Sequence, residues 1–173
     1  EVRAYLPPRS AMGIILEIDR LLKDIKPTPK TSLATQLHDI ALMMKRRSVG
    51  VVVSDLLSDA EDILGGLEHL RFDGHNVIVM HTLDPYEIEF PFDGTWRFEG
   101  LEGEEPLTTQ PQRIRDEYLK NFGEYMESIR SGCVAAQIDY AVVDTSRPLD
   151  VLLSEFFHER ETTLGGGSPT ARP

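Results

Sequence analysis

The sequence predicts an α/β fold of three layers, in which helices cover both faces of a mostly parallel sheet. Short apolar runs rich in β-branched residues alternate along the chain with longer segments whose apolar residues recur every three or four positions. This is the pattern of strands that alternate with amphipathic helices and are joined by crossover connections. The short runs carry almost no charge, which is typical of strands covered on both faces. We therefore expect core strands at Val49–Ser54, Val77–His81 and Ile138–Val143.

The N-terminal part of the chain is expected to form one strand and two helices. The stretch Glu1–Leu6 has the composition of a strand, which Pro7 and Pro8 end. Apolar residues then recur at helical spacing from Ala11 to Ile25, and Pro27 stops this helix because proline has no backbone N–H to donate. The apolar stripe of the second helix is formed by Leu33, Leu37, Ile40, Ala41 and Met44.

The strand at Val49–Ser54 leads into a helix whose start fits a capping box. The Ser58 side chain can accept from the backbone ahead of it, and the Glu61 side chain can accept from the backbone behind it. The buried stripe of this helix is expected to be Ile63, Leu64, Leu67 and Leu70. Gly74 suits the left-handed position that commonly ends a helix, and the strand at Val77–His81 follows it.

The alternation breaks between Asp84 and Glu105, where prolines and glycines are frequent. Trp96 and Phe98 alternate there with polar residues, which predicts a small antiparallel hairpin. Eight acidic residues in this segment are opposed by a single basic residue, Arg97. Two interpretations stay open: a docking surface for a basic partner, or a solvated hairpin that its charge keeps soluble.

The C-terminal part is expected to add two helices and the last core strand. Pro111 opens a long helix, whose inward stripe comprises Ile114, Tyr118, Phe122, Tyr125 and Ile129. Pro148 starts the final helix. We expect residues 1–160 to form one domain and residues 161–173, which contain three consecutive glycines, to form a disordered tail.

Composition and charge exclude several classes of protein. The 173 residues include 29 acidic and 18 basic ones, and the resulting net charge of −11 repels phosphate backbones, so nucleic-acid binding is not expected. No uncharged apolar run is long enough to cross a membrane. The single cysteine, Cys133, excludes an internal disulfide framework and fits a reducing compartment, so we expect a cytoplasmic protein with a buried, inert thiol. Because Glu1 already belongs to a strand-like run, we expect the chain to begin inside a larger protein, with a processed terminus as the alternative.

Oxygen-bearing side chains follow the predicted core strands, at the edge where ligands bind in open α/β sheets. Asp55, Asp84 and Asp144 come at or just after the ends of these strands, and Thr31 could join them from the start of its helix. Hard oxygen ligands of this kind suit Mg²⁺, Mn²⁺ or Ca²⁺. The alternative is that Asp55, Thr31 and Ser146 cap the helices that follow them.

Other residue patterns that are typical of metal, nucleotide-binding or catalytic sites are missing from the sequence. His75 and His81 flank one predicted strand and lie ~20 Å apart at its rise per residue, too far to share one zinc ion. The chain contains neither of the glycine-rich nucleotide-binding motifs and no nucleophile elbow. The residues therefore offer no evident set of general base and nucleophile.

Several stretches of the chain resemble the C-terminal half of the bacterial family catalogued as domain of unknown function 58. These stretches are Tyr5–Ser10, Val53–Leu57, Gly74–Val79, Asp84–Pro85, Glu89–Gly94, Ile138–Tyr140 and Asp144–Leu149. They occur in the family's order and together cover residues 5 to about 160. The resemblance implies a von Willebrand factor type A-like domain, which has a Rossmann-like fold and is truncated here.

Type A-like domains carry a metal-ion-dependent adhesion site built from three loops. Thr31 matches the threonine of the second loop, and Asp55 matches the aspartate of the third. The Asp-x-Ser-x-Ser sequence of the first loop does not occur in the chain. We therefore expect an incomplete site with no metal in this chain alone, and Mg²⁺ only in a full-length protein that supplies the first loop and the first strands.

Members of this family often accompany MoxR-type AAA+ ATPases, which implies a role in assembling or activating other protein complexes without enzymatic activity. We therefore expect a non-enzymatic protein-interaction module with a protein partner such as a MoxR-type ATPase. The alternative is a metal-dependent hydrolase or phosphotransferase that acts at Asp55. Because the first strands of the domain are missing, we also expect the free edge of Val49–Ser54 to pair with another chain in a homodimer or larger assembly, unless Val2–Leu6 covers it.

Overall fold

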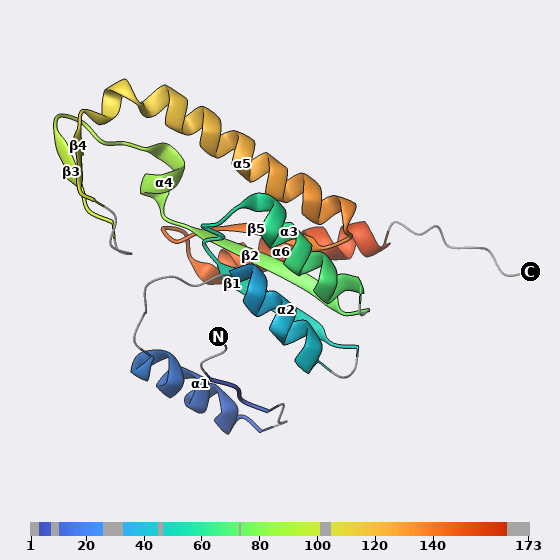
Figure 1. Cartoon of the computed structure of the whole chain (residues 1–173). Coiled ribbons are helices and arrows are strands. Elements are labelled where there is room, and N and C mark those ends of the chain that lie inside the picture. Colours follow the sequence, from blue (N-terminus) through green and yellow to red (C-terminus); the bar gives the residue numbers. More distant parts are fainter. Residues whose placement is uncertain are drawn as a thin grey trace, which may run out of the picture.

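The computed structural model describes residues 4–7, 11–25, 33–44, 47–72, 74–100 and 105–165. Helices and strands alternate through much of this part of the chain (Figure 1). In order they are α1 (Gly13–Asp24), α2 (Leu33–Met43), β1 (Val49–Ser54), α3 (Ala60–Phe72), β2 (Asn76–Leu83), α4 (Pro85–Glu89), β3 (Trp96–Phe98), β4 (Leu107–Thr109), the 3₁₀ turn Pro111–Arg113, α5 (Arg115–Ala135), β5 (Asp139–Asp144) and α6 (Leu149–Gly165).

The central sheet of the described chain has three parallel strands in the order β1-β2-β5. Val52 of β1 lies opposite Val79 of β2, which in turn lies opposite Tyr140 of β5. The three runs predicted as core strands are thus the three strands of this sheet, and their parallel pairing is confirmed. A parallel sheet of this kind, with helical crossovers, is a Rossmann-like α/β arrangement.

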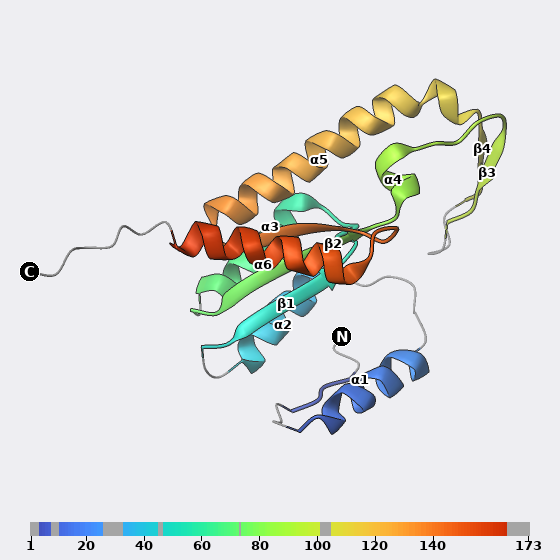
Figure 2. The ribbon, with the colours of Figure 1, turned by 180° about the vertical axis from the view of Figure 1, so that it is seen from behind.

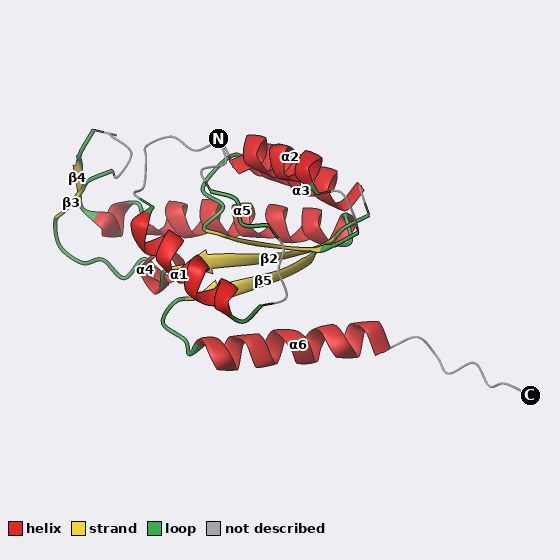
Figure 3. Ribbon diagram, turned by 90° about the horizontal axis from the view of Figure 1, so that it is seen from below, coloured by secondary structure: helices red, strands yellow, loops and turns green. Residues whose placement is uncertain are grey.

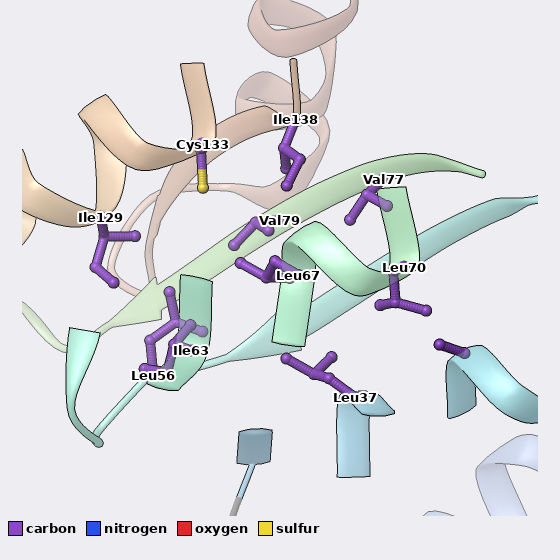
Figure 4. Close-up of a cluster of buried hydrophobic side chains, with 11 residues drawn as sticks. Leu37, Leu56, Ile63, Leu67, Leu70, Val77, Val79, Ile129, Cys133 and Ile138 are labelled. Carbon is purple, nitrogen blue, oxygen red and sulfur yellow. The ribbon is translucent and has the colours of Figure 1, made fainter. Parts of the chain in front are cut away.

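Helices cover both faces of the sheet, as expected for three layers. Helices α2, α3 and α5 lie on one face, and α6 lies on the other (Figure 3). The larger core fills the first interface, where side chains of the helices, β2 and the β1–α3 loop meet (Figure 4). Its buried residues are Leu37, Ala41, Leu56, Ile63, Leu67, Leu70, Val77, Val79, Ile129, Cys133 and Ile138. A smaller cluster of Ile78, Met80 and Phe156 joins α6 to the opposite face.

Strand β1 is less covered than the sequence predicts. Its side chains alternate in burial: Val52 packs against the larger core, whereas Val49, Val51 and Val53 are 57%, 55% and 69% exposed. The expectation of a strand buried on both faces is therefore wrong for the described chain. The smaller cluster under α6 is built on β2 and β5, so the valines of β1 on that side lack a covering layer.

The N-terminal elements also differ from expectation. Residues 4–7 do not form a strand, and residues 1–3 lie outside the described part of the chain. Helix α1 forms where its periodicity predicts, but it has no buried residue, and Ile15, Ile18 and Leu22 of its apolar stripe are exposed. In both side views this helix stands apart from the layered body (Figures 1 and 2). Periodicity predicts that a helix forms, but it does not identify the surface that the helix covers.

The start of α3 is capped one residue later than predicted. The Oδ1 atom of Asp59, rather than the hydroxyl of Ser58, accepts from the backbone N–H groups of Glu61 (2.9 Å) and Asp62 (3.4 Å). A carboxylate caps a helix as well as a hydroxyl does, so either residue satisfied the sequence pattern. The left-handed backbone predicted at Gly74 is confirmed by its φ of 82°.

The segment after β2 contains the predicted hairpin and one helix that was not predicted. Strands β3 and β4 pair antiparallel, with Trp96 opposite Thr109, and residues 101–104 between them lie outside the description. The short helix α4 begins at a capping box: Asp84 Oδ1 accepts from Tyr86 N, and Glu87 Oε2 accepts from Asp84 N, both at 2.8 Å. This box fixes α4 directly beyond the end of β2.

The last helix is longer than predicted. Helix α6 runs to Gly165, so residues 161–165 continue the helix instead of starting a disordered tail. The predicted start of the tail, residue 161, precedes its first glycine, Gly165, which ends the helix as glycine commonly does. Residues 166–173, the rest of the predicted tail, lie outside the described part of the chain.

Candidate functional site

The chain leaves β1 through a tight turn at the carboxyl edge of the sheet. The Asp55 carboxylate accepts from Leu57 N at 3.3 Å, and the Ser54 hydroxyl accepts from Leu56 N at 3.1 Å. Leu56 has a φ of 50°, in the left-handed region, which costs a residue with a side chain about 1 kcal/mol. Complete burial of the Leu56 side chain in the larger core offsets this cost.

The side chain of His81, on β2, forms a hydrogen bond to the backbone of this turn. Its imidazole is fully buried, and Nε2 lies 2.9 Å from the backbone oxygen of Asp55 while Nδ1 lies 2.8 Å from the hydroxyl of Tyr140. A carbonyl oxygen can only accept, so Nε2 carries the proton and Nδ1 accepts from Tyr140. Burial lowers the pKa of His81, outweighing the Asp55 carbonyl and the carboxylates of Asp55 and Glu87, which favour the charged form. His81 is therefore neutral at pH 7.

Helix α5 also forms a side-chain hydrogen bond to the backbone of this turn. The hydroxyl of Tyr125 donates to the backbone oxygen of Leu56, the residue next to the carbonyl that His81 binds. Burial raises the pKa of Tyr125, and the nearby carboxylates of Asp55 and Asp59 raise it further, so the phenol keeps its proton. Two consecutive carbonyls of the loop are thus fixed by side chains from two different elements.

An open groove of about 430 Å³ lies beside this turn, beyond the carboxyl ends of β1 and β2. The loop after β1 forms one wall, helix α5 forms the other, and the end of β2 and α4 close one side. The lining residues are Asp55, Leu57, Ser58, Leu83, Glu87, Tyr118, Phe122 and Tyr125. Ligand sites of open α/β sheets lie at this edge, so the groove is the candidate site of the fold.

The α5 wall of the groove is aromatic. The rings of Tyr118 and Phe122 are nearly parallel, with an interplanar angle of 7° and centroids 5.7 Å apart. Tyr118 also stacks on Phe90 at 4.3 Å and donates its hydroxyl to the backbone oxygen of Glu87 at 3.0 Å. These contacts tie α4 to α5 and fix the aromatic wall relative to the two carboxylates of the groove.

Of the residues predicted to bind a metal, Asp55 lies exposed at the rim of the groove, and Thr31 falls outside the described part of the chain. The other two strand-end carboxylates serve local turns. Asp84 caps α4, and Asp144 accepts from the backbone N–H and the hydroxyl of Ser146 at 2.9 and 2.7 Å. These hydrogen bonds lower the pKa of Asp144. Asp55 itself accepts from Leu57 N within the turn, and Asp59 caps α3, so the interpretation of Asp55 as the cap of that helix is wrong.

The residues described around Asp55 do not fit a divalent-cation site by themselves. Among the described side chains, no three of His, Cys, Asp or Glu come together as a metal would require. Both nitrogens of His81 already have hydrogen-bond partners. His75 precedes β2 and its Nδ1 accepts from Ser48 N at 3.2 Å, at the opposite end of the strand from His81, as the sequence predicts.

The sequence predicts an inward position for some of the groove residues, but it does not predict that they line a groove. Tyr118, Phe122 and Tyr125 were predicted as the inward face of their helix, and only Ile129 of that stripe is fully buried. Glu87 is one of the eight acidic residues of the segment from Asp84 to Glu105, and its sequence context does not predict a place in a groove. The phenol groups of Tyr118 and Tyr125 were the available signal, because an inward tyrosine usually directs its hydroxyl to a polar boundary.

Two further expectations concern the rest of the chain. Cys133 is buried in the larger core, and burial raises the pKa of its thiol to about 11, which confirms an inert thiol. No helix in the described ranges has both the length and the apolar character needed to cross a membrane.

Comparison with known proteins assigns the chain to a family. The model of the family described as protein of unknown function DUF58 matches residues 1–127. The chain belongs to this family. The match to DUF58 covers every residue that lines the groove, and it confirms the resemblance seen in the sequence. No curated protein and no solved structure matches the chain.

Proposed function

We propose that this DUF58 chain is a non-enzymatic protein-interaction module. In this proposal it is part of a von Willebrand factor type A-like domain that works with a MoxR-type AAA+ ATPase in assembling or activating protein complexes. The observation that carries the proposal is the groove beside the Asp55–Ser58 loop, whose aromatic wall and fixed backbone offer a ready surface for a protein segment.

The geometry of the loop favours binding over catalysis. Leu57 is 83% exposed at the rim, while the carbonyls of the two residues before it, Asp55 and Leu56, are anchored by His81 and Tyr125. An apolar side chain presented on a fixed backbone loses little conformational freedom when a partner covers it. A hydrolase acting at Asp55 would need a general base within reach, and the neutral imidazole of His81 is occupied on both nitrogens.

The proposed partner and metal follow from the family. The MoxR-type ATPase is proposed because the resemblance seen in the sequence implies such a partner, and the chain belongs to the DUF58 family. Mg²⁺ is proposed only for a full-length protein, in which a further loop would complete the ligands that Thr31 and Asp55 begin. We also propose that this segment works in the cytoplasm, where a lone reduced cysteine such as Cys133 is normal.

The proposal is tested by measuring the binding of a purified MoxR-type ATPase from the same organism to immobilised protein that contains this segment. Leu57→Asp places a charge at the groove and is expected to weaken binding about ten-fold or more, as for an interface anchor. Phe72→Asp is the matched control, because Phe72 is 88% exposed at the other end of α3. Equal effects of the two variants, or no binding by the unmodified protein, would overturn the proposal.

A further inference from the structure

The charges of the groove are all of one sign. Asp55 contributes a carboxylate from the loop after β1, and Glu87 contributes one from α4. None of the described residues that line the groove is basic. The remaining lining side chains are apolar, aromatic or hydroxyl-bearing, so a neutral apolar segment would leave both carboxylates beside a covered surface without a cation.

The aromatic wall suits a planar cation. The rings of Tyr118 and Phe122 stack nearly parallel along α5, and both residues line the groove. A guanidinium or ammonium group over such rings is attracted by their negative faces, and a guanidinium can also stack on them. Carboxylates on the neighbouring walls would supply the charge-assisted hydrogen bonds that such a group requires.

The basic residues of the hairpin and of the first turns of α5 have partners of their own, including Lys120, whose Nζ lies 3.9 Å from Glu124 Oε1. Arg97 of the hairpin is paired with Glu99 at 3.0 Å. Arg115, at the start of α5, donates to the backbone oxygens of Phe90 and Glu89 at 3.2 and 3.0 Å. The segment from residue 84 to 105 holds eight acidic residues and one basic residue, and this net negative charge favours a positively charged partner.

From these observations we propose that the groove binds a basic segment of a partner protein, with an arginine or lysine side chain seated between Asp55, Glu87 and the rings of Tyr118 and Phe122. This inference rests on the proposed function, to which it adds the chemistry of the docking segment. A basic protein segment is favoured over a nucleic acid because the net charge of −11 repels a phosphate backbone.

The test uses a fluorescein-labelled decapeptide with four arginines and two leucines, and the same peptide with citrulline in place of each arginine. Citrulline keeps the size and most of the shape of arginine but carries no charge. Fluorescence anisotropy is measured with the full chain in buffer containing EDTA, so that no divalent cation shields Asp55. We expect the arginine peptide to bind about ten-fold more tightly than the citrulline peptide at low salt, and to lose this advantage at 1 M salt.

Matched variants locate the binding. Glu87→Gln removes the charge while the glutamine can still cap α4, and it is expected to weaken the arginine peptide about three- to ten-fold and leave the citrulline peptide unchanged. Glu89→Gln makes the same change on the same helix outside the groove lining and is expected to have little effect. Phe122→Leu keeps an apolar side chain but removes a ring, with an expected loss of about two- to five-fold.

Several results would overturn the inference. These are equal binding of the two peptides, no binding of either at millimolar concentration, or equal losses for Glu87→Gln and Glu89→Gln. If the ATPase binds through Leu57 but the arginine peptide fails, the proposed function stands and the basic chemistry is wrong. If the peptide binds as expected but the ATPase does not, the groove chemistry stands and the proposed partner is wrong.

Discussion

Replacing His81 with leucine is expected to lower the free energy of unfolding by about 2–4 kcal/mol. The substitution removes the hydrogen bonds to the Asp55 carbonyl and from the Tyr140 hydroxyl, each worth about 1 kcal/mol net. The Asp55 carbonyl is then left without its buried donor, which adds up to about 2 kcal/mol. Leucine is close to histidine in volume, so the loss comes from hydrogen bonding and not from a large cavity.

The loss is measured by urea unfolding followed by circular dichroism at pH 7.5, with linear extrapolation to water. His158→Leu is the control, because His158 is exposed on α6 and its replacement is expected to change stability by less than about 0.5 kcal/mol. Hydrogen exchange at Leu56 and Leu57 then reports the loop itself and is expected to speed up in His81→Leu alone. A stability change as small as that of the control, with exchange unaltered, would show that His81 does not hold the loop.

Three further outcomes are expected. Because burial lowers the folded-state pKa of His81, the contribution of His81 to the free energy of unfolding should be complete above pH 6.5 and should be lost as the pH falls toward the lowered pKa. Urea unfolding at pH 7.5, 6.5 and 5.5 should show a steeper fall in stability for the unmodified protein than for His81→Leu. Equal slopes for the two proteins would contradict this. Calorimetry should find no micromolar Mg²⁺ binding by this chain, and tight binding that Asp55→Ala abolishes would prove the expectation wrong. Light scattering at tens of micromolar should show a dimer or larger assembly that Val51→Lys weakens, because a lysine on β1 opposes edge pairing; a clean monomer with β1 amides protected from exchange would count against it.

The sheet could be predicted because its signals are local. The run from Val49 to Ser54 is rich in β-branched residues and uncharged, which favours an extended backbone. Its burial could not be predicted, because exposure of Val49, Val51 and Val53 depends on which helix covers that face. The same distinction explains α1, whose periodicity was correct while its apolar stripe stayed exposed.

The candidate site could be predicted only in part. Asp55 was found because a carboxylate at the end of a core strand lies at the edge where ligands bind. The groove itself is a tertiary feature: Tyr118 and Phe122 line the same groove as Asp55 only because α5 lies beside the loop after β1. Helix α4 carried a readable signal, since Asp84, Pro85 and Glu87 form a capping box with proline at the first helical position.

Site-specific cross-linking tests most directly whether the groove is the docking surface. The photoreactive amino acid p-benzoylphenylalanine is placed at Leu57 in one protein and at Phe72 in another, since both side chains are largely exposed. Each protein is irradiated with the purified MoxR-type ATPase, and the cross-linked product is identified by mass spectrometry. We predict a cross-link from position 57 to a basic segment of the ATPase and none from position 72. No cross-link from position 57, or equal cross-linking from both positions, would contradict it.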